Sequence, residues 1–308
     1  MENTLKLTPA VFALDVPATL DKISRFIAGT LADSPREGIV VPISGGLDSS
    51  VVAALCVRAV GPAQVLGLML PERFGNPEAV RFGRMVADHL GLTTRRLNIT
   101  PILRGVGSFF PFISALAGRE RTKPAVHGWM EHRGMTTRSY FLADLRGTLD
   151  PTSRRLIANI AVKQRARMLA TYRVADEANF LVAGAAHKTE DAVGLFIKYG
   201  VDDAADLMPL LHLQRSHILQ LADGLELPAE IIGRPPNPDI LPGVTDKYVG
   251  ELGMGYETVD LIIYGSEHGL SAQEIGAQLG IATAAVAELQ EIIRLAEWTR
   301  SHALAPQF

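Results

Sequence analysis

Apolar and polar positions change along the first hundred residues in blocks that predict strands and helices in turn. The apolar run Ile39–Ile43 predicts a buried strand, and a helical pattern from Ser49 to Val60 follows it. A second strand is expected over residues 64–70, a helix over 77–90 and a third strand near 94–99. Strands that alternate with helices of about 12 residues are typical of a parallel sheet built from β-α-β units. We therefore expect an α/β fold in which an open parallel sheet is flanked by helices.

Helical periodicity marks longer elements on either side of these strands. Apolar residues recur at helical spacing from Leu20 to Leu31, which predicts a covering helix ahead of the first strand. A long helix is expected over residues 151–178, because this segment opens with Pro-Thr-Ser, which suits a helix start. The run Phe180–Ala183 then predicts a further buried strand.

The chain beyond this strand is predicted to be mainly helical. The next helix is expected to carry His187, Glu190 and Lys198. Residues 250–308 are expected to form a helical C-terminal region. We predict that residues 1–308 make a single domain.

Residues 104–153 interrupt the regular pattern. This stretch holds aromatic residues such as Phe109–Phe112 and Trp129, and between Arg119 and Arg155 eight Lys and Arg residues stand against four Asp and Glu residues. One interpretation is a solvated basic loop. The other is a basic aromatic flap that covers an anionic substrate, with arginines on phosphate or carboxylate groups.

Composition narrows the classes of protein to consider. The chain has 308 residues, of which 47% are hydrophobic, and a net charge of −3, which argues against a general nucleic-acid binder but leaves room for a local basic patch. Cys56 is the only cysteine, so a disulfide framework, a cysteine-based zinc site and a Cys-x-x-Cys redox pair are excluded. The chain shows no charged-then-apolar leader and no apolar run of about 18 residues. We expect a cytoplasmic protein without a membrane span.

The clearest chemical signal is the turn between the first strand and its helix. A strand that ends in small residues and leads into a helix presents backbone N–H groups to an anion, aided by the positive end of the helix. Glycine allows close approach of phosphate, serine adds hydroxyl donors, and an aspartate supplies a carboxylate suited to Mg²⁺. The turn reads Ser44, Gly45, Gly46, Leu47, Asp48, Ser49 and Ser50. It is therefore predicted to be a phosphate-binding loop with a metal ligand inside it.

This loop differs from the common nucleotide-binding motifs. The Gly-x-x-x-x-Gly-Lys-Ser/Thr loop requires a lysine that reaches the β- and γ-phosphates, and no lysine lies between Ser44 and Ser50. The Gly-x-Gly-x-x-Gly dinucleotide pattern is also missing here. The seven residues resemble the Ser-Gly-Gly-x-Asp-Ser-Ser loop of the N-type ATP pyrophosphatases. In that family the loop holds the phosphates that leave as pyrophosphate while a substrate is adenylated.

Further motifs make the resemblance more specific, since four stretches in sequence order are similar to NAD synthetase, the amide-forming member of that superfamily. They are the Ser44–Ser50 loop; Arg165–Met168 with Tyr172 and Val182–Gly184; Glu190 with Gly194–Gly200 and Asp206–Leu210; and Pro235–Pro236 with Leu241–Asp246, Gly253 and Tyr256. The similarity covers roughly residues 20–305 and is weakest in the basic aromatic stretch.

The resemblance implies an ammonia-dependent ligase. ATP would adenylate the nicotinate carboxylate of deamido-NAD with release of pyrophosphate, and ammonia would then displace AMP to give NAD. Mg²⁺ is the implied cofactor, and no nucleophilic side chain is required. The family also implies a homodimer, with ammonia taken free or from a separate glutaminase.

The resemblance assigns roles to particular residues. It implies ATP contacts from the Ser44–Ser50 loop and, downstream, from Ala185, Arg215 and Asn237. Asp48 and Glu190 carry over as metal carboxylates. The acid substrate is expected to contact Arg165, Lys198, Asp206 and His302.

The chain departs from the family pattern at several of these positions. Ala185 and Asn237 stand where threonine hydroxyls are usual, and Arg215 replaces a lysine, which keeps the charge but not the geometry. Lys247 replaces a glutamate and reverses a charge, and the near-terminal His-Lys pair is displaced around His302.

Three alternatives remain open at this point. An amide ligase for another carboxylic acid is favoured by the departures on the substrate side. A tRNA-modifying ATP pyrophosphatase could use the basic stretch, but the chain lacks the cysteines common in sulfur transfer. The segment from Gly269 to Val286 has the rhythm of a helix-turn-helix, yet its second helix opens without a basic residue, so paired-helix packing is favoured over DNA binding.

Overall fold

A parallel sheet organises the first two thirds of the chain in the computed structural model, which describes residues 5–73, 75–108, 136–237 and 245–301. Its four strands lie in the order β3-β2-β1-β4. Val40 of β1 pairs with Leu66 of β2 on one side and with Val182 of β4 on the other. The strands are β1 Gly38–Pro42, β2 Val65–Met69, β3 Thr93–Arg96 and β4 Phe180–Val182. The expected open parallel sheet is confirmed.

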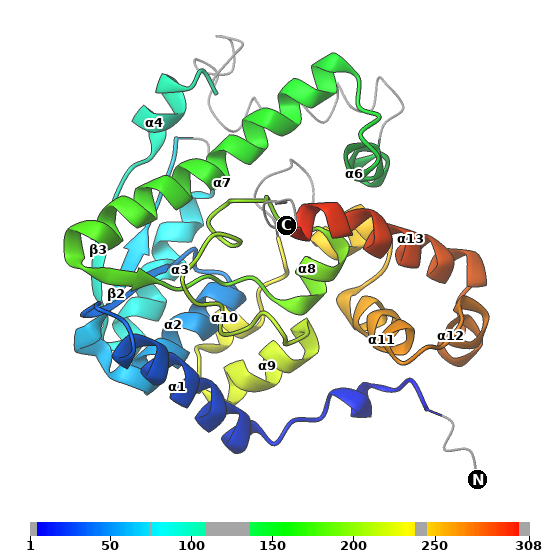
Figure 1. The fold of residues 1–308 in the computed structure, drawn as a ribbon, viewed down its shortest axis with the longest axis horizontal. Coiled ribbons are helices and arrows are strands. Elements are labelled where there is room, and N and C mark those ends of the chain that lie inside the picture. The colour runs from blue at the N-terminus through cyan, green and yellow to red at the C-terminus, as the bar shows by residue number, and fades with distance from the viewer. Residues whose placement is uncertain (1–4, 74, 109–135, 238–244, 302–308) are drawn as a thin grey trace, which may run out of the picture.

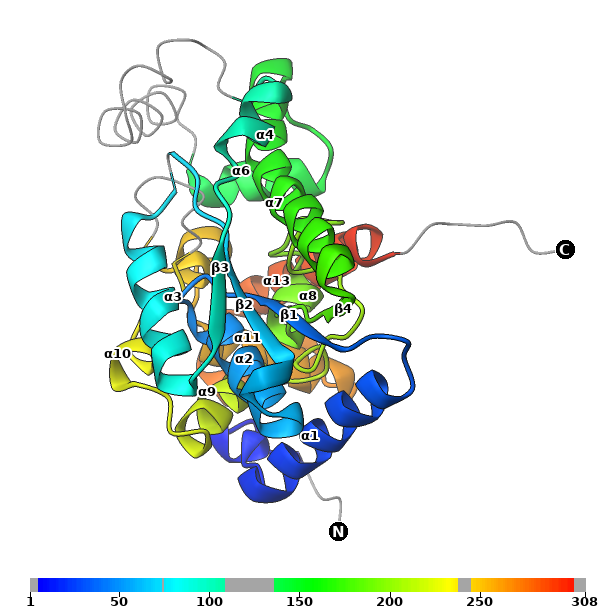
Figure 2. The same cartoon turned by 90° about the vertical axis from the view of Figure 1, so that its left-hand side faces the viewer.

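Helices cover both faces of the sheet, with α3 on one side and α7 on the other (Figure 2). Because side chains alternate along a strand, Ile39 and Val41 pack with α1 and α2, whereas Val40 packs against Val174 of α7. The run of consecutive apolar residues in β1 follows from this burial on both faces. The covering helices are α1 Val16–Ala32, α2 Leu47–Val60, α3 Pro77–Leu90 and α7 Pro151–Ala178.

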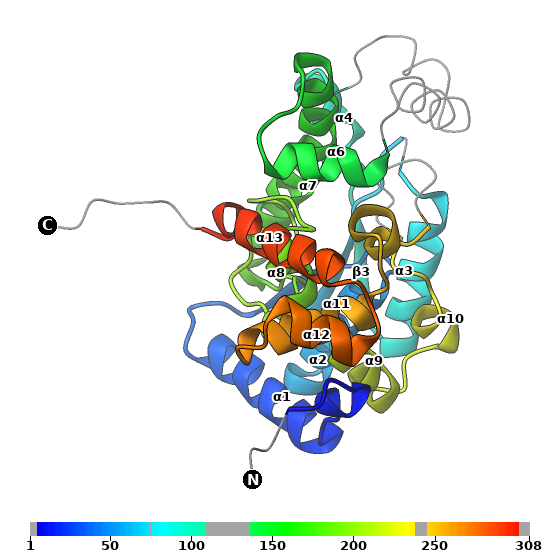
Figure 3. The same cartoon turned by 90° about the vertical axis from the view of Figure 1, so that its right-hand side faces the viewer.

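A second hydrophobic cluster lies under the C-terminal helices, which gather at one side of the molecule (Figures 1 and 3). These helices are α11 Tyr256–Glu267, α12 Ala272–Leu279 and α13 Thr283–Arg300. Val193 of α8 is part of the same cluster, so the C-terminal helices pack directly against the helix that follows β4 in the chain. The predicted helical C-terminal region is confirmed over these elements, and the paired helices of the predicted helix-turn-helix are α12 and α13.

Short helices connect these layers. They are α4 Thr100–Gly105, α6 Thr137–Leu145, α8 Lys188–Val193, α9 Arg215–Gly224 and α10 Ala229–Ile232, with 3₁₀ turns η1 Pro9–Phe12 and η2 Pro62–Gln64 and the π-helical turn η3 Tyr248–Leu252. Among the helices that the described residues form, none is both long and apolar enough to cross a membrane.

One local prediction is corrected. Lys198 does not share a helix with His187 and Glu190, because α8 ends at Val193, where Gly194 takes a left-handed conformation with φ +75°.

Within the predicted flap, Thr136 starts α6 with a capping box that the weak apolar pattern did not reveal. Residues 109–135 of the flap lie outside the described residues, and the division of the chain into one domain with a flap stays a prediction.

Candidate functional site

A cavity of about 390 Å³ opens at the carboxyl end of β1. Ligands of open α/β sheets bind at this edge, and the volume falls within the roughly 300–1,000 Å³ usual for small-molecule sites. The turn into α2 forms its floor, and α7, α8, α9 and the segment 234–237 contribute to its walls. Elements distant in the sequence therefore meet at the predicted phosphate-binding loop.

The turn between β1 and α2 is shaped by its first glycine. Gly45 has φ +74°, and a Cβ atom there would lie 2.5 Å from Phe82 Cβ and 2.8 Å from Gly83 N. Both the left-handed backbone and the close approach of α3 therefore require glycine. The guanidinium of Arg234 donates to the Gly45 carbonyl, which holds the turn from the other side.

Hydroxyl groups hold the rest of the turn in place. Ser44 Oγ accepts from Gly46 N at 3.2 Å and lies 3.0 Å from Ser49 Oγ, and Ser50 Oγ donates to Gly46 O at 2.7 Å. The N-cap of α2 is Gly46, which makes no side-chain cap hydrogen bond. The first N–H groups of α2 therefore face the cavity without a capping side chain, as an anion site requires.

Two carboxylates and one imidazole meet beside this turn. Asp48 lies in the first turn of α2, and His187 and Glu190 lie at the start of α8, with ligand atoms all within 4.8 Å of one another. His187 is fully buried, and its Nε2 lies 3.0 Å from Glu190 Oε1 and 3.9 Å from Asp48 Oδ1. The oxygen donors of Asp48 and Glu190 suit Mg²⁺, which prefers carboxylate ligands.

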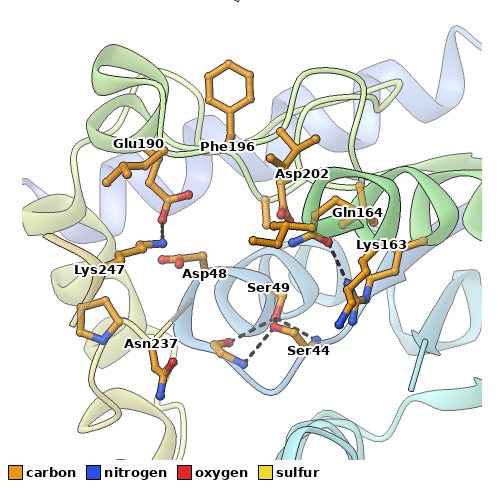
Figure 4. Close-up of a pocket in the computed structure, with 18 of the residues that line it drawn as sticks. Ser44, Asp48, Ser49, Lys163, Gln164, Glu190, Phe196, Asp202, Asn237 and Lys247 are labelled. Atoms are coloured by element: carbon orange, nitrogen blue, oxygen red, sulfur yellow. Dashed lines mark hydrogen bonds and ion pairs between the residues drawn. The ribbon is translucent and has the colours of Figure 1, made fainter. Parts of the chain in front are cut away.

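Two cations of the protein already pair with these carboxylates. Arg215 Nη1 lies 3.2 Å from Asp48 Oδ1, and the ammonium of Lys247 contacts Glu190 Oε1 (Figure 4). Burial raises the pKa of Glu190, but Lys247 and His187 outweigh burial and hold that pKa well below its ordinary value. Burial lowers the pKa of Lys247, but Glu190 and Asp48 outweigh it and raise that pKa. Both partners are therefore charged at neutral pH.

Helix α7 contributes a polar wall through Lys163, Gln164 and Arg167. Lys163 Nζ lies 2.8 Å from Glu72 Oε1, a carboxylate whose side chain is only 2% exposed. Arg167 Nη1 donates to Gln164 Oε1 at 3.2 Å. Lys163 and Gln164 lie across the cavity from Lys247, so cationic groups border the anion site on two sides (Figure 4).

Two further acidic residues in the cavity were missed by the sequence analysis. Burial, and then the negative charge of Glu190, raises the pKa of Asp202 to about 6. Burial also raises the pKa of Glu251 to about 7, although Lys247 opposes the shift. Perturbed carboxyls in a cleft mark candidate functional positions. Their sequence contexts are irregular, and the only available signal was their position next to segments that resemble the family motifs.

Most of the residues predicted to contact ATP or metal line this cavity. They are Ser44, Gly46, Leu47, Asp48, Ser49, Ala185, Glu190, Arg215 and Asn237. Gly45 and Ser50 are not among the lining residues, since Gly45 packs on α3 and Ser50 is fully buried beneath the turn. His302 lies outside the described residues.

The other residues predicted to contact the acid substrate do not line the cavity. Arg165 Nε donates to the backbone carbonyl of Lys198 at 3.2 Å, and Lys198 Nζ contacts Trp298 O and Ser301 Oγ, both at 3.3 Å. Asp206 Oδ2 accepts from Val182 N at 2.7 Å and so extends the hydrogen bonding at the edge of β4. The structure therefore brings Arg165 and Lys198 together next to residues of the cavity wall, but not among the residues that line it.

Known proteins that resemble this chain agree with one another. The sequence model of NAD synthase matches residues 19–121 and 136–303. The NH3-dependent NAD⁺ synthetase of Coprothermobacter proteolyticus is 32% identical over 258 residues, which cover 82% of this chain and 86% of the relative. The enzyme of that name from Methanocaldococcus jannaschii is 33% identical over 290 residues, which cover 94% of this chain and 96% of the relative.

Solved structures share the fold. An NMN synthetase from Francisella tularensis aligns with a TM-score of 0.69 at 22% identity, over 96% of this chain and 100% of that one. An NH3-dependent NAD synthetase from Campylobacter jejuni aligns with a TM-score of 0.67 at 21% identity, again over 96% of this chain and 100% of that one.

Proposed function

The chain belongs to the NAD synthase family, and we propose that it is an amide-forming ligase that makes NAD from deamido-NAD, ATP and ammonia. A carboxylate oxygen of the acid attacks the α-phosphorus of ATP, and the bond to the departing pyrophosphate breaks. Ammonia then attacks the acyl carbon, the bond to AMP breaks, and the nitrogen loses a proton as the amide forms.

The observation that carries this proposal is that the Ser44–Ser50 turn, which includes Asp48, shares one cavity with the carboxylate of Glu190. The uncapped start of α2 and the cationic wall of α7 suit the phosphates of ATP. Arg215 adds support, because its Nε is buried and has no hydrogen-bond partner within the described part of the chain. A buried donor of this kind suits an acceptor that the nucleotide would bring.

We propose Asp48 and Glu190 as the carboxylates for Mg²⁺, since their oxygen atoms fit its ligand preference. When bound, Mg²⁺ would neutralise the negative charge that develops on the phosphates during adenylation. His187 holds the Glu190 carboxylate in place through the 3.0 Å contact of its Nε2. Asp48 is also held by Arg215, so both carboxylates are oriented before a ligand enters.

The remaining assignments are part of the same proposal. Ala185, Arg215 and Asn237 line the same cavity as the phosphate-binding turn and are proposed to contact ATP. For the acid substrate we propose Arg165, Lys198, Asp206 and His302 on the strength of the motif resemblance. Ammonia would be taken free or from a separate glutaminase, and the protein is proposed to be a cytoplasmic homodimer.

A second candidate function is the amidation of a different carboxylic acid. It is favoured by the placement of Arg165, Lys198 and Asp206, none of which lines the cavity that holds the turn. Each missing polar contact would remove about 1–3 kcal/mol of binding free energy, so several together could change the acid that is recognised.

A pyrophosphate-release assay with ATP, Mg²⁺ and ammonia separates the two candidates. We expect deamido-NAD to turn over best in comparison with a panel of nucleotide and small carboxylic acids, with NAD, AMP and pyrophosphate as products. Release with another acid and none with deamido-NAD would assign the second function. ADP and phosphate as products would reject adenylation itself.

A further inference from the structure

Lys247 places a positive charge between the two carboxylates proposed to hold Mg²⁺. Its ammonium contacts Glu190 Oε1, and the carboxylate of Asp48 points toward the same ammonium (Figure 4). The Lys247 and Glu190 side chains are only 15% and 11% exposed, so water screens this pair weakly. A cation of the protein therefore lies where a metal ion would bind.

The two cations of the site differ in how firmly they are held. Arg215 is 4% exposed in its side chain, begins α9, and lies over the rings of Tyr248 and Tyr256 at 5.9 and 5.5 Å. Lys247 lies at the start of η3 and reaches Glu190 through a flexible four-carbon stem. Arg215 is thus a fixed partner of Asp48, whereas the ammonium of Lys247 can move away by rotation of its own side chain.

We propose that Lys247 is an internal counter-ion that occupies Glu190 in the free protein and leaves this carboxylate when a divalent cation binds. The inference rests on the proposed metal role of Asp48 and Glu190. An ammonium and a divalent cation on one carboxylate oxygen repel each other strongly in a site with little solvent, so the two arrangements exclude each other. Lys247 is a positioning residue in this scheme and touches no reacting atom.

The consequence is that metal binding is coupled to nucleotide binding. Without ATP, a divalent cation must displace Lys247 from Glu190 and break a mostly buried ion pair, which is unfavourable unless new negative charge enters the site. The phosphates of ATP bring the negative charge that the displaced ammonium needs. The free protein is therefore expected to bind divalent cations weakly, and Glu190 stays neutralised until the nucleotide arrives.

The test measures Mn²⁺ binding to the full chain by electron paramagnetic resonance, without ATP or acid substrate. We expect Lys247→Met to bind Mn²⁺ at least about 10-fold more tightly than the wild type, because Glu190 is then free to act as a ligand. Lys188→Met is the matched control, since Lys188 pairs with Glu267 at 2.6 Å in a partly exposed ion pair outside the cavity. Its Mn²⁺ affinity should equal that of the wild type.

A double variant identifies the carboxylate that takes the metal. In Lys247→Met combined with Glu190→Gln, the gain in Mn²⁺ affinity should disappear. A gain that persists in the double variant would overturn the proposal, as would equal affinities of Lys247→Met and the wild type. If Lys247→Met does not fold, Lys247→Gln gives the same comparison, and the rise in Tm on adding MnCl2 reports binding independently. Because no acid is present, the result does not depend on which acid the protein amidates.

Discussion

Thr189 Oγ1 donates a hydrogen bond of 2.6 Å to Oδ1 of Asp260, and the same hydroxyl accepts from the backbone N–H of Arg215 at 2.8 Å. The other oxygen of Asp260 accepts from Ser216 N at 2.9 Å and from Ser216 Oγ at 2.6 Å. Asp260 is fully buried on α11. One carboxylate of the C-terminal region thus fixes the starts of α8 and α9, and with them the partners of Asp48.

We expect Asp260→Asn to weaken both folding and ATP binding. An amide in place of the carboxylate loses acceptor capacity and leaves a buried donor unpaired, which costs about 1–3 kcal/mol of the free energy of unfolding. Guanidinium chloride unfolding measures this loss. Titration with ATP measures the change in ATP affinity that is expected if Arg215 moves from its position. Asp223→Asn, an exposed change on α9, is the control. Unchanged ATP affinity in a destabilised Asp260→Asn protein would limit Asp260 to a role in stability.

Gly45→Ala should cost far more stability than Gly91→Ala. Both glycines have positive φ, +74° and +65°, but an added Cβ meets Phe82 and Gly83 at position 45 and nothing within 4 Å at position 91. The left-handed backbone costs about 1–2 kcal/mol in each variant, and overpacking adds about 1–3 kcal/mol at position 45 only. Thermal unfolding of the two variants compares these costs directly. Equal losses would show that α3 can move away from the turn.

Asp48→Asn tests the proposed metal carboxylate. The substitution keeps the shape but removes the charge, so we expect turnover to fall by roughly 100-fold or more while the protein stays folded. Some stability should also be lost, because Arg215 loses its anionic partner. Initial rates across a range of MgCl2 concentrations measure the effect, and Asp21→Asn, which breaks the exposed pair with Arg58, is the control. A wild-type rate at limiting Mg²⁺ would remove Asp48 from the metal site.

The sheet and its covering helices could be predicted because their signals are local. Ile39–Ile43 is apolar throughout, since both faces of β1 are buried, and a seven-residue turn in which only Leu47 is neither small, hydroxylic nor acidic follows it directly. The error at Lys198 arose where a single glycine, Gly194, ended α8 inside a sequence that reads as helical. A left-handed glycine and an interior helical glycine look the same in the sequence.

The cation and acid pairs of the cavity could not be predicted in the same way. Lys247 is separated from Glu190 by 57 positions, and only the fold brings them into contact. The sequence marked Lys247 as a reversed charge without indicating the carboxylate it neutralises. Asp202 likewise lies next to segments that resemble the family motifs, but its raised pKa depends on burial that comes from the surrounding elements.

Asp202 predicts a particular pH dependence of stability. Burial, followed by the charge of Glu190, raises its pKa from 3.8 in the unfolded chain to about 6 in the folded protein. Between these two pH values the folded state binds more protons than the unfolded state. The free energy of unfolding therefore falls as the pH rises through this window, and the whole decrease is present above pH about 6.

Asp202→Asn removes this penalty, because the amide does not ionise. The variant should therefore be more stable than the wild type at pH 8 by about 1–3 kcal/mol, with the lower part of the range favoured by the partial exposure of the side chain. The advantage should shrink as the pH approaches 4, where the wild-type carboxyl is also neutral. Denaturant unfolding at pH 4.5, 6 and 8 measures the trend, with the exposed Asp88→Asn on α3 as the control. If the difference in unfolding free energy between the wild type and Asp202→Asn is the same at all three pH values, Asp202 does not titrate in this range. Its carboxylate would then already be compensated by a charge within the cavity.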